Sequence, residues 1–222
     1  MFGIILTIIT YEIGVSIRNK WRNPLLNPIL IATILIIGFL TITGISYDTY
    51  KVGGDYISFF LGPVTVLLAV PLYKHIQALK KNWFPILAGI FVGSVTSVVC
   101  VIACAKIFGL SKTLMLSLLP KSITIPMGSV FSEQIGGIPS ITIVSIVITG
   151  ITGAVTAPLV CRYFRIKNPI AQGVAIGTSS HALGTTKAME IGEVQGAMSS
   201  LSIGVAGIVT VFVTPVLLKF FE

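Results

Sequence analysis

The sequence predicts an all-α integral membrane protein with about six transmembrane helices and two re-entrant or broken-helix hairpins arranged as an inverted repeat. Three observations carry this fold class. Of the 222 residues, 54% are hydrophobic and only 10% are charged, which leaves too little polar surface to cover a water-soluble globule. Long apolar runs are separated by short basic breaks. Two further runs carry clusters of polar side chains at their centres.

The apolar runs supply the transmembrane helices. About 20 apolar residues cross a hydrocarbon core ~30 Å thick. Six runs are expected to cross it, at residues 2–17, 28–46, 57–73, 84–109, 138–161 and 196–218. The first is short, so it is expected to tilt, thin the bilayer or pack against a partner. Because no basic region precedes it, it is expected to be retained rather than cleaved as a signal peptide.

The runs 111–130 and 170–189 are interrupted by the sequences LPKSITIPMGS and GTSSHALGTTK. Prolines, glycines, hydroxyls and ionisable side chains at this density cannot form a lipid-facing helix. Each segment is therefore expected to be a broken helix or a re-entrant hairpin buried in protein. The expected tips are residues 120–126 and residues 179–184.

Loop charges predict the orientation. The loops 18–24, 74–82 and 162–168 are basic and the loop 48–56 is not, so the positive-inside rule places the three basic loops in the cytoplasm. Both termini are then outside. The first interrupted segment dips in from the outside and the second from the cytoplasm, with a complete crossing of the second as the alternative.

A shift of 57 residues superimposes the two interrupted segments and the helices that follow them. It aligns seven identical residues, among them Ser122 with Ser179, Glu133 with Glu190, Gly150 with Gly207 and Pro158 with Pro215. The expected organisation is scaffold helices at 1–56 and 57–110, a first repeat at 111–161 and a second at 168–218. Inverted repeats whose interrupted helices meet at the bilayer midplane are a recurring plan of secondary transporters.

The two polar centres form the candidate substrate site. Half-helix amino termini attract anions, and hydroxyl and cationic side chains add further donors. The expected substrate is small, polar and anionic. Its candidate binding residues are Lys121, Ser122, Thr124, Thr178, Ser179, Ser180, His181, Thr185 and Thr186. The candidates for coupling to a proton or sodium ion are His181, Lys187, Glu133 and Glu190, and those that shape the backbone are Pro126, Gly128, Gly177 and Gly184.

Each of these residues also has a structural interpretation. Serine and threonine hydroxyls often bond a carbonyl one turn back, and lysines can extend to the membrane interface. The glutamates can end a helix without further function. Intramembrane ionisable groups are costly, which favours His181 as a ligand or proton carrier.

Other classes of function are not expected. Cys100, Cys104 and Cys161 lie in apolar stretches without metal-ligand spacing, so buried packing and no metal or cofactor are predicted. The formal net charge of +8 comes from loop clusters and not from a basic stripe, which argues against nucleic acid. Ser179 and His181 match no hydrolase elbow, which argues against an enzyme.

The stretches LPKSITIPMG, SEQIGGIP, RIKNPIAQGVAIGTSSHALGTTKAMEIGEVQGAMSS and ISFFLGPVTVLLAVPLYK resemble the hallmark segments of the LrgB/CidB family of antiholin-like membrane proteins. The resemblance covers residues 57–217, and the first 55 residues fit in hydropathy only. Relatives often carry threonine where this chain has Ile125, so not every hydroxyl of the family's first tip is present.

The resemblance implies two functions. One is transport of small monocarboxylates such as pyruvate, glycolate or glycerate, as in the chloroplast glycolate/glycerate translocator. The other is regulation of murein hydrolase export and cell lysis. It also implies a multi-pass protein of the cell membrane, in contact with lipid, with a small LrgA/CidA-type membrane partner and possible homo-oligomers. Two symmetry-related polar tips favour transport by alternating access, because a regulator does not need them.

Overall fold

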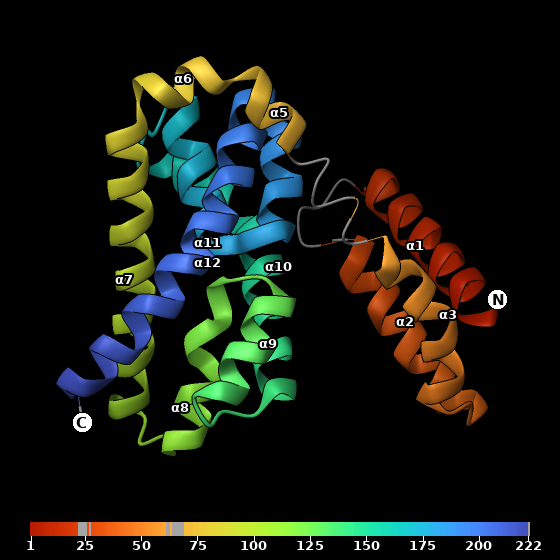
Figure 1. The fold of residues 1–222 in the computed structure, drawn as a ribbon. Coiled ribbons are helices and arrows are strands. Elements are labelled where there is room, and N and C mark those ends of the chain that lie inside the picture. The colour runs from red at the N-terminus through yellow and green to blue at the C-terminus, as the bar shows by residue number, and fades with distance from the viewer. Residues whose placement is uncertain (22–25, 27, 61–62, 64–68, 222) are drawn as a thin grey trace. The chain divides into compact units, whose positions relative to one another are not determined.

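The residues that the computed structural model describes, which are 1–21, 26, 28–60, 63 and 69–221, form helices joined by turns and short loops, with no strand among them. Four helices among them are long and apolar enough to cross a membrane, at Phe2–Trp21, Trp83–Ile107, Pro139–Tyr163 and Glu193–Phe220 (Figure 1). The prediction of an all-α integral membrane protein is confirmed. The chain divides into two compact units, Met1–Leu67 and Leu68–Glu222.

The first unit contains α1 (Phe2–Trp21), α2 (Pro28–Thr43) and α3 (Tyr47–Phe59). The apolar run 2–17 is short, but α1 continues beyond it through Arg18 and Lys20, and cations at a helix carboxyl terminus are favourable. The second helix is shorter than expected. Its 16 residues extend over about 24 Å, less than the ~30 Å of a hydrocarbon core.

The polar stretch 48–56 was expected to be a loop, and instead it forms most of α3. Ser46 caps this helix by accepting a hydrogen bond from the Thr49 amide, and Asp48 complements the helix dipole in the first turn. α3 also packs closely on α1, because a Cβ atom on Gly53 would lie 2.7 Å from the Gly3 Cα. The polar residues of this stretch therefore mark a capped helix and not a loop.

The second unit holds the remaining helices that the structure describes. They are α5 (Ala69–Lys74), α6 (Ile76–Lys81), α7 (Trp83–Ile107), α8 (Lys112–Leu118), the 3-10 helix η1 (Leu119–Ser122), α9 (Ile125–Gln134), α10 (Pro139–Tyr163), α11 (Pro169–Ile191) and α12 (Glu193–Phe221). The predicted helix 57–73 starts in α3 and ends in α5, and most of its centre, residues 61–62 and 64–68, lies outside the described residues. The expected loop 74–82 is a short helix, α6, for most of its length.

The first interrupted segment is a hairpin formed by α8, η1 and α9. Its arms end together, because the Ile138 amide donates a hydrogen bond to the Ser117 Oγ at 2.7 Å and Thr142 donates to the Ser117 carbonyl at 2.8 Å. Ser132 and Thr142 are joined by a hydrogen bond of 2.6 Å. These buried bonds fix both arms against the start of α10.

The second interrupted segment, α11, also folds back on itself. Its backbone leaves helical geometry at His181, where φ is 41° and ψ is −139°. Ile176 and Ala188 belong to one buried cluster with Ala157, although twelve residues of straight helix would hold them about 18 Å apart. Gln172 and Gln195 are joined by a hydrogen bond of 3.1 Å, so the segment starts and ends at one end of the unit.

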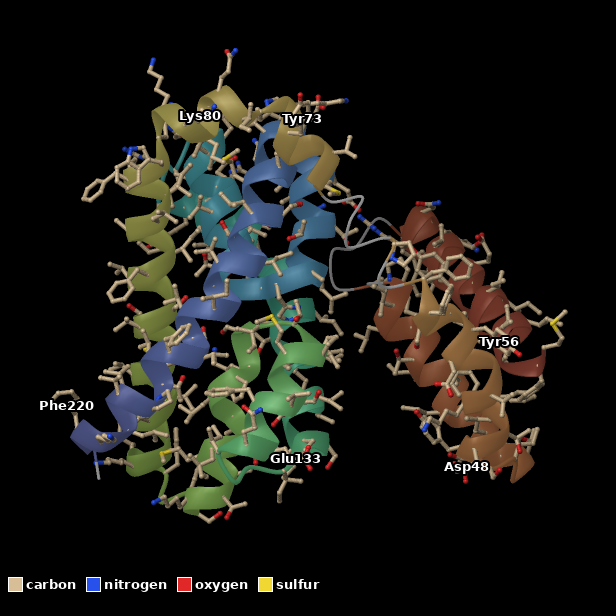
Figure 2. The ribbon with its side chains drawn as sticks, viewed as in Figure 1. Asp48, Tyr56, Tyr73, Lys80, Glu133 and Phe220 are labelled. Carbon is tan, nitrogen blue, oxygen red and sulfur yellow. The ribbon has the colours of Figure 1, made fainter. Side chains whose placement is uncertain are left out.

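The two hairpins come from opposite ends of the second unit. The basic segments 74–82 and 162–168 share one end, at the top of Figure 1, because Asn82 and Asn168 line a single cavity. Figure 2 shows Lys80 at this end and Glu133, at the base of the first hairpin, at the other. Both tips therefore lie between the ends, beside the middle of α7.

Candidate functional site

The tip of the first hairpin is held by a small polar network. Ile123 and Thr124 are extended, with ψ values of 178° and 152°, and Pro126 lies in the first turn of α9. This break leaves Ser122 against α7, where its Oγ is 2.9 Å from the Ser97 Oγ. Lys121 donates to both hydroxyls, at 3.2 Å to Ser122 and 3.3 Å to Ser97. The network fixes a cation at the tip.

The tip of the second hairpin is held through His181, whose side chain is buried. Its Nε2 lies 2.9 Å from the Ile146 carbonyl oxygen, and since a carbonyl only accepts, Nε2 carries a proton. The ring lies against Gly150, where a Cβ atom would be 2.6 Å from His181 Cε1. Thr185 donates to the His181 carbonyl at 3.0 Å and is 2.7 Å from the Ser199 Oγ.

The backbone of His181 yields a first prediction. A φ of 41° is unfavourable for a residue with a Cβ atom and accessible to glycine. His181→Gly and His181→Ala both lose the hydrogen bond to Ile146, but only the glycine variant relieves the strain. His181→Gly should be more stable than His181→Ala by about 1 kcal/mol in detergent unfolding. Equal stabilities would show that the left-handed geometry is absent.

One cleft receives residues from both tips. It has a volume of about 490 Å³ and is lined by Lys121 of the first tip and by Ser179 and Ser180 of the second. The two serine hydroxyls are 3.0 Å apart. Thr149, Thr152 and Thr156 of α10 also line it. The cleft thus combines one ammonium group with several hydroxyls, and no carboxylate is among its described lining residues.

The other predicted site residues lie elsewhere. Thr186 is exposed and bonds the Ala182 carbonyl, and Lys187 forms an ion pair of 2.8 Å with Glu190. Glu133 is exposed at the base of the first hairpin (Figure 2). Four further candidates belong to the tips but do not line the cleft; they are Ser122, Thr124, His181 and Thr185. Thr178 is buried, and its hydroxyl has no partner within the described part of the chain.

The residues predicted to shape the backbone lie at close helix contacts. A Cβ on Gly177 would be 2.8 Å from the Ser199 Cα of α12, and one on Gly184 would be 2.5 Å from the Ser180 Cβ. Gly128 lies similarly against Ile146. Pro126 ends the break before α9. These positions let the hairpin arms pack within backbone distance of their neighbours.

Several residues of the site carry no clear signal in the sequence. Ser97 is one hydroxyl within the long apolar helix α7. Thr149, Thr152 and Thr156 recur at spacings of three and four, so they share a face of α10, and that periodicity is the only marker they offer. Gly153 lies where α10 meets Ser180.

The cysteines differ from expectation. Cys161 is buried, as predicted, but Cys100 and Cys104 are exposed on α7. The prediction of burial is wrong for these two because an apolar thiol can equally well face outward from a membrane helix. Among the described residues, no group of three or more histidine, cysteine or acidic side chains could hold a metal ion.

Electrostatically the cleft suits a small anion. An ammonium group held at 3.2 to 3.3 Å from two hydroxyls is fixed in position before any ligand arrives. Charge-assisted hydrogen bonds from such a group to a carboxylate are the stronger kind in proteins. The serine and threonine hydroxyls supply neutral donors that orient the rest of a small polar molecule.

Comparisons with known proteins agree over nearly the whole chain. The model of the LrgB-like family matches residues 7–220. Proteins named antiholin-like protein LrgB from Bacillus mycoides, Bacillus cereus and Bacillus anthracis are each 41% identical over 220 residues, which is 99% of this chain and 96% of theirs. No solved structure matches the chain significantly.

Proposed function

The chain belongs to the LrgB-like family, and from this premise we propose that it transports small monocarboxylates of the pyruvate, glycolate or glycerate type across the membrane. One observation carries the proposal. Lys121 from the first tip and Ser179 and Ser180 from the second line a single cleft of about 490 Å³. A carboxylate there would bind the ammonium group, and the hydroxyls would hold its remaining oxygens.

The proposed mechanism is alternating access through an inverted repeat. The 57-residue shift pairs Gly150 with Gly207, and their contacts support this relation. Gly150 of α10 lies against Leu183 of the second tip, and Gly207 of α12 lies against Met127 of the first. Each long helix thus packs on the hairpin of the other repeat. In the proposal, the hairpins with α10 and α12 move against the earlier helices.

The wider setting belongs to the same proposal. We place the protein in the cell membrane as a multi-pass protein, with a small LrgA/CidA-type partner and the option of homo-oligomers. Transport is coupled to a proton or a sodium ion. His181 is the preferred coupling residue because it joins the second tip to α10 through its hydrogen bond with Ile146. The pair Lys187 and Glu190 is the other candidate.

A second candidate function comes from the relatives. They are named antiholin-like, which favours a role in regulating murein hydrolase export and cell lysis more directly than it favours transport. In that case the cleft would be incidental to function. A carboxylate carrier that changes the metabolic state of the cell would also alter lysis, so a lysis phenotype does not separate the two functions.

Uptake of radiolabelled pyruvate or glycolate into proteoliposomes separates them. Saturable uptake is expected from the chain alone or together with the small partner, and empty liposomes provide the baseline. Absence of uptake under both conditions, from protein that still changes murein hydrolase activity when expressed in cells, would rule out transport. The second candidate would then stand.

A further inference from the structure

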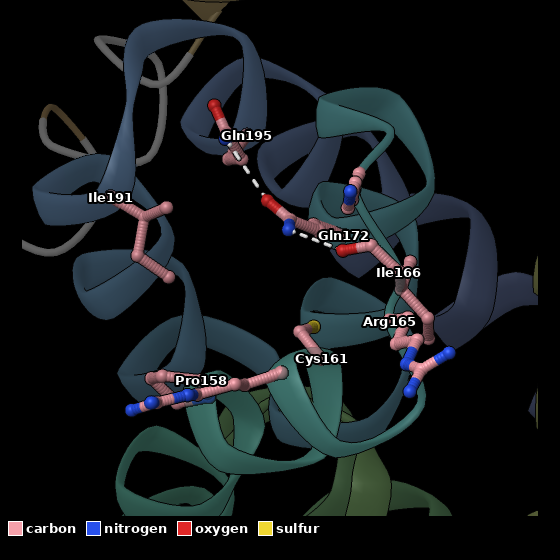
Figure 3. Close-up of a pocket in the computed structure, with 9 residues that line it drawn as sticks. Pro158, Cys161, Arg165, Ile166, Gln172, Ile191 and Gln195 are labelled. Atoms are coloured by element: carbon pink, nitrogen blue, oxygen red, sulfur yellow. Dashed lines mark hydrogen bonds between the residues drawn. The ribbon is translucent and has the colours of Figure 1, made fainter.

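A second cavity lies at the basic end of the same unit (Figure 3). It has a volume of about 570 Å³ and lies between the end of α10 and the start of α11. Arg162, Arg165 and Lys167 line it, together with Gln172 and Gln195. Within the described part of the chain, none of the three cations forms an ion pair with a carboxylate. The cavity is therefore strongly cationic.

Arg165 occupies a position that does not favour a side chain. The turn after α10 is closed by hydrogen bonds from Ile166 N to Cys161 O at 2.8 Å and from Arg165 N to Arg162 O at 3.2 Å. This helix ending places Arg165 in the left-handed region, with φ of 55°, where glycine is preferred. The turn disfavours a side chain at this position, and the arginine that occupies it lines the cavity beside it.

The two glutamines add neutral donors to the same cavity. Gln195 Nε2 donates to Gln172 Oε1 at 3.1 Å, and Gln172 Nε2 donates to the Ile166 carbonyl at 2.7 Å (Figure 3). Each amide nitrogen carries a second N–H. The cavity can therefore both attract and hydrogen-bond a carboxylate.

This cavity adjoins the cleft that contains Lys121. Cys161 and Ile166 line both, so they lie at the boundary between the two, here called the neck. We propose that the cationic cavity is the entry vestibule of the transport pathway, which collects small carboxylates at the basic end and passes them by Cys161 to Lys121. The inference rests on the proposed function and deepens it by assigning the route and the charge selection to Arg162, Arg165 and Lys167.

Cys161 provides the test, because its thiol reports the local potential at the neck. Cys100→Ala and Cys104→Ala leave it as the sole cysteine. The rate of modification by each reagent is divided by that reagent's rate with a free thiol in solution. The ratio of this normalised rate for an anionic methanethiosulfonate to that for a cationic one of similar size should be at least about ten. The ratio should fall as salt rises, because the Debye length shortens from ~10 Å at 0.1 M to ~3 Å at 1 M.

Removal of two of the three vestibule charges should weaken this preference. Arg162→Gln with Arg165→Gly leaves Lys167 in place and should lower the ratio at least about threefold, and the glycine suits the left-handed turn, which guards against misfolding. Lys80→Gln with Lys81→Gln is the matched control, since it removes two charges from the same end outside the cavity and should leave the ratio high. Unreactive Cys161, or an undiminished preference in the arginine variant, would overturn the proposal.

Labelling does not require transport, so its outcome is independent of uptake. An anion preference without any pyruvate uptake would reject the transport function, and the vestibule with it, while showing that the cavity attracts anions. Pyruvate should slow the modification of Cys161 relative to the same concentration of chloride. Uptake that proceeds while pyruvate gives no protection would show that substrate enters by another route, and the vestibule would be rejected.

Discussion

Lys121→Ala is expected to lower pyruvate uptake by about 10- to 100-fold, the effect of losing hydrogen bonds from one charged group. Lys121 is the cation of the cleft, and no other described lining residue replaces its charge. The tip should survive the change, because Ser97 and Ser122 remain hydrogen-bonded to each other at 2.9 Å. Initial rates in proteoliposomes over a range of pyruvate concentrations measure the loss.

Lys112→Ala is the matched control for this variant. Lys112 is a lysine of the same hairpin, but it lies exposed at the start of α8 and does not line the cleft. Its removal should change uptake by no more than about twofold, as expected for an exposed surface residue. Equal losses in the two variants would point to general damage to the hairpins. Full uptake by Lys121→Ala would contradict the assignment of the cleft.

The interrupted segments are predictable because their polar groups conflict with lipid. A segment with Pro120, Lys121 and Pro126 at its centre cannot cross a bilayer as an ordinary helix, and the structure breaks it at Ile123 and Thr124. The break in α11 falls at His181, within the predicted tip 179–184, and the imidazole there bonds the Ile146 carbonyl of another helix.

The wall of the cleft is not predictable from the sequence. Thr156 donates to the Thr152 carbonyl one turn back, as most threonines in membrane helices do. The local pattern of such a residue is the same whether it faces lipid or a site. Only the packing of α10 against the second tip distinguishes them, and that packing depends on contacts between residues far apart in the chain.

The predicted helix ends in the first unit differ from the structure for another reason. Hydropathy ends a predicted helix where polar residues begin, whereas the real end depends on capping and on neighbouring backbone. Arg18 and Lys20 extend α1, and Ser46 starts a polar helix. The close approach of Gly3 and Gly53 then joins α1 to α3. None of these effects can be read from the length of an apolar run.

Gly153→Ala is expected to destabilise the second unit by about 1–3 kcal/mol, the usual cost of overpacking. A Cβ atom at this position would overlap the side chain of Ser180, including its Oγ. The second tip would have to move away from α10. Because Ser180 lines the cleft, uptake should fall together with the apparent free energy of unfolding measured in detergent.

Gly204→Ala tests whether any added methyl group would have this effect. Among the described residues, no atom beyond its own stretch of helix backbone lies within 4 Å of its Cβ position, so the same substitution in α12 should stabilise the helix by about 0.4–1 kcal/mol. Ser180→Gly should recover much of the stability lost in Gly153→Ala, because it removes the overlapping atoms. A double-mutant cycle isolates that interaction. Additive effects would mean that α10 and the second tip do not touch at Gly153, and the cleft between them would lose its structural basis.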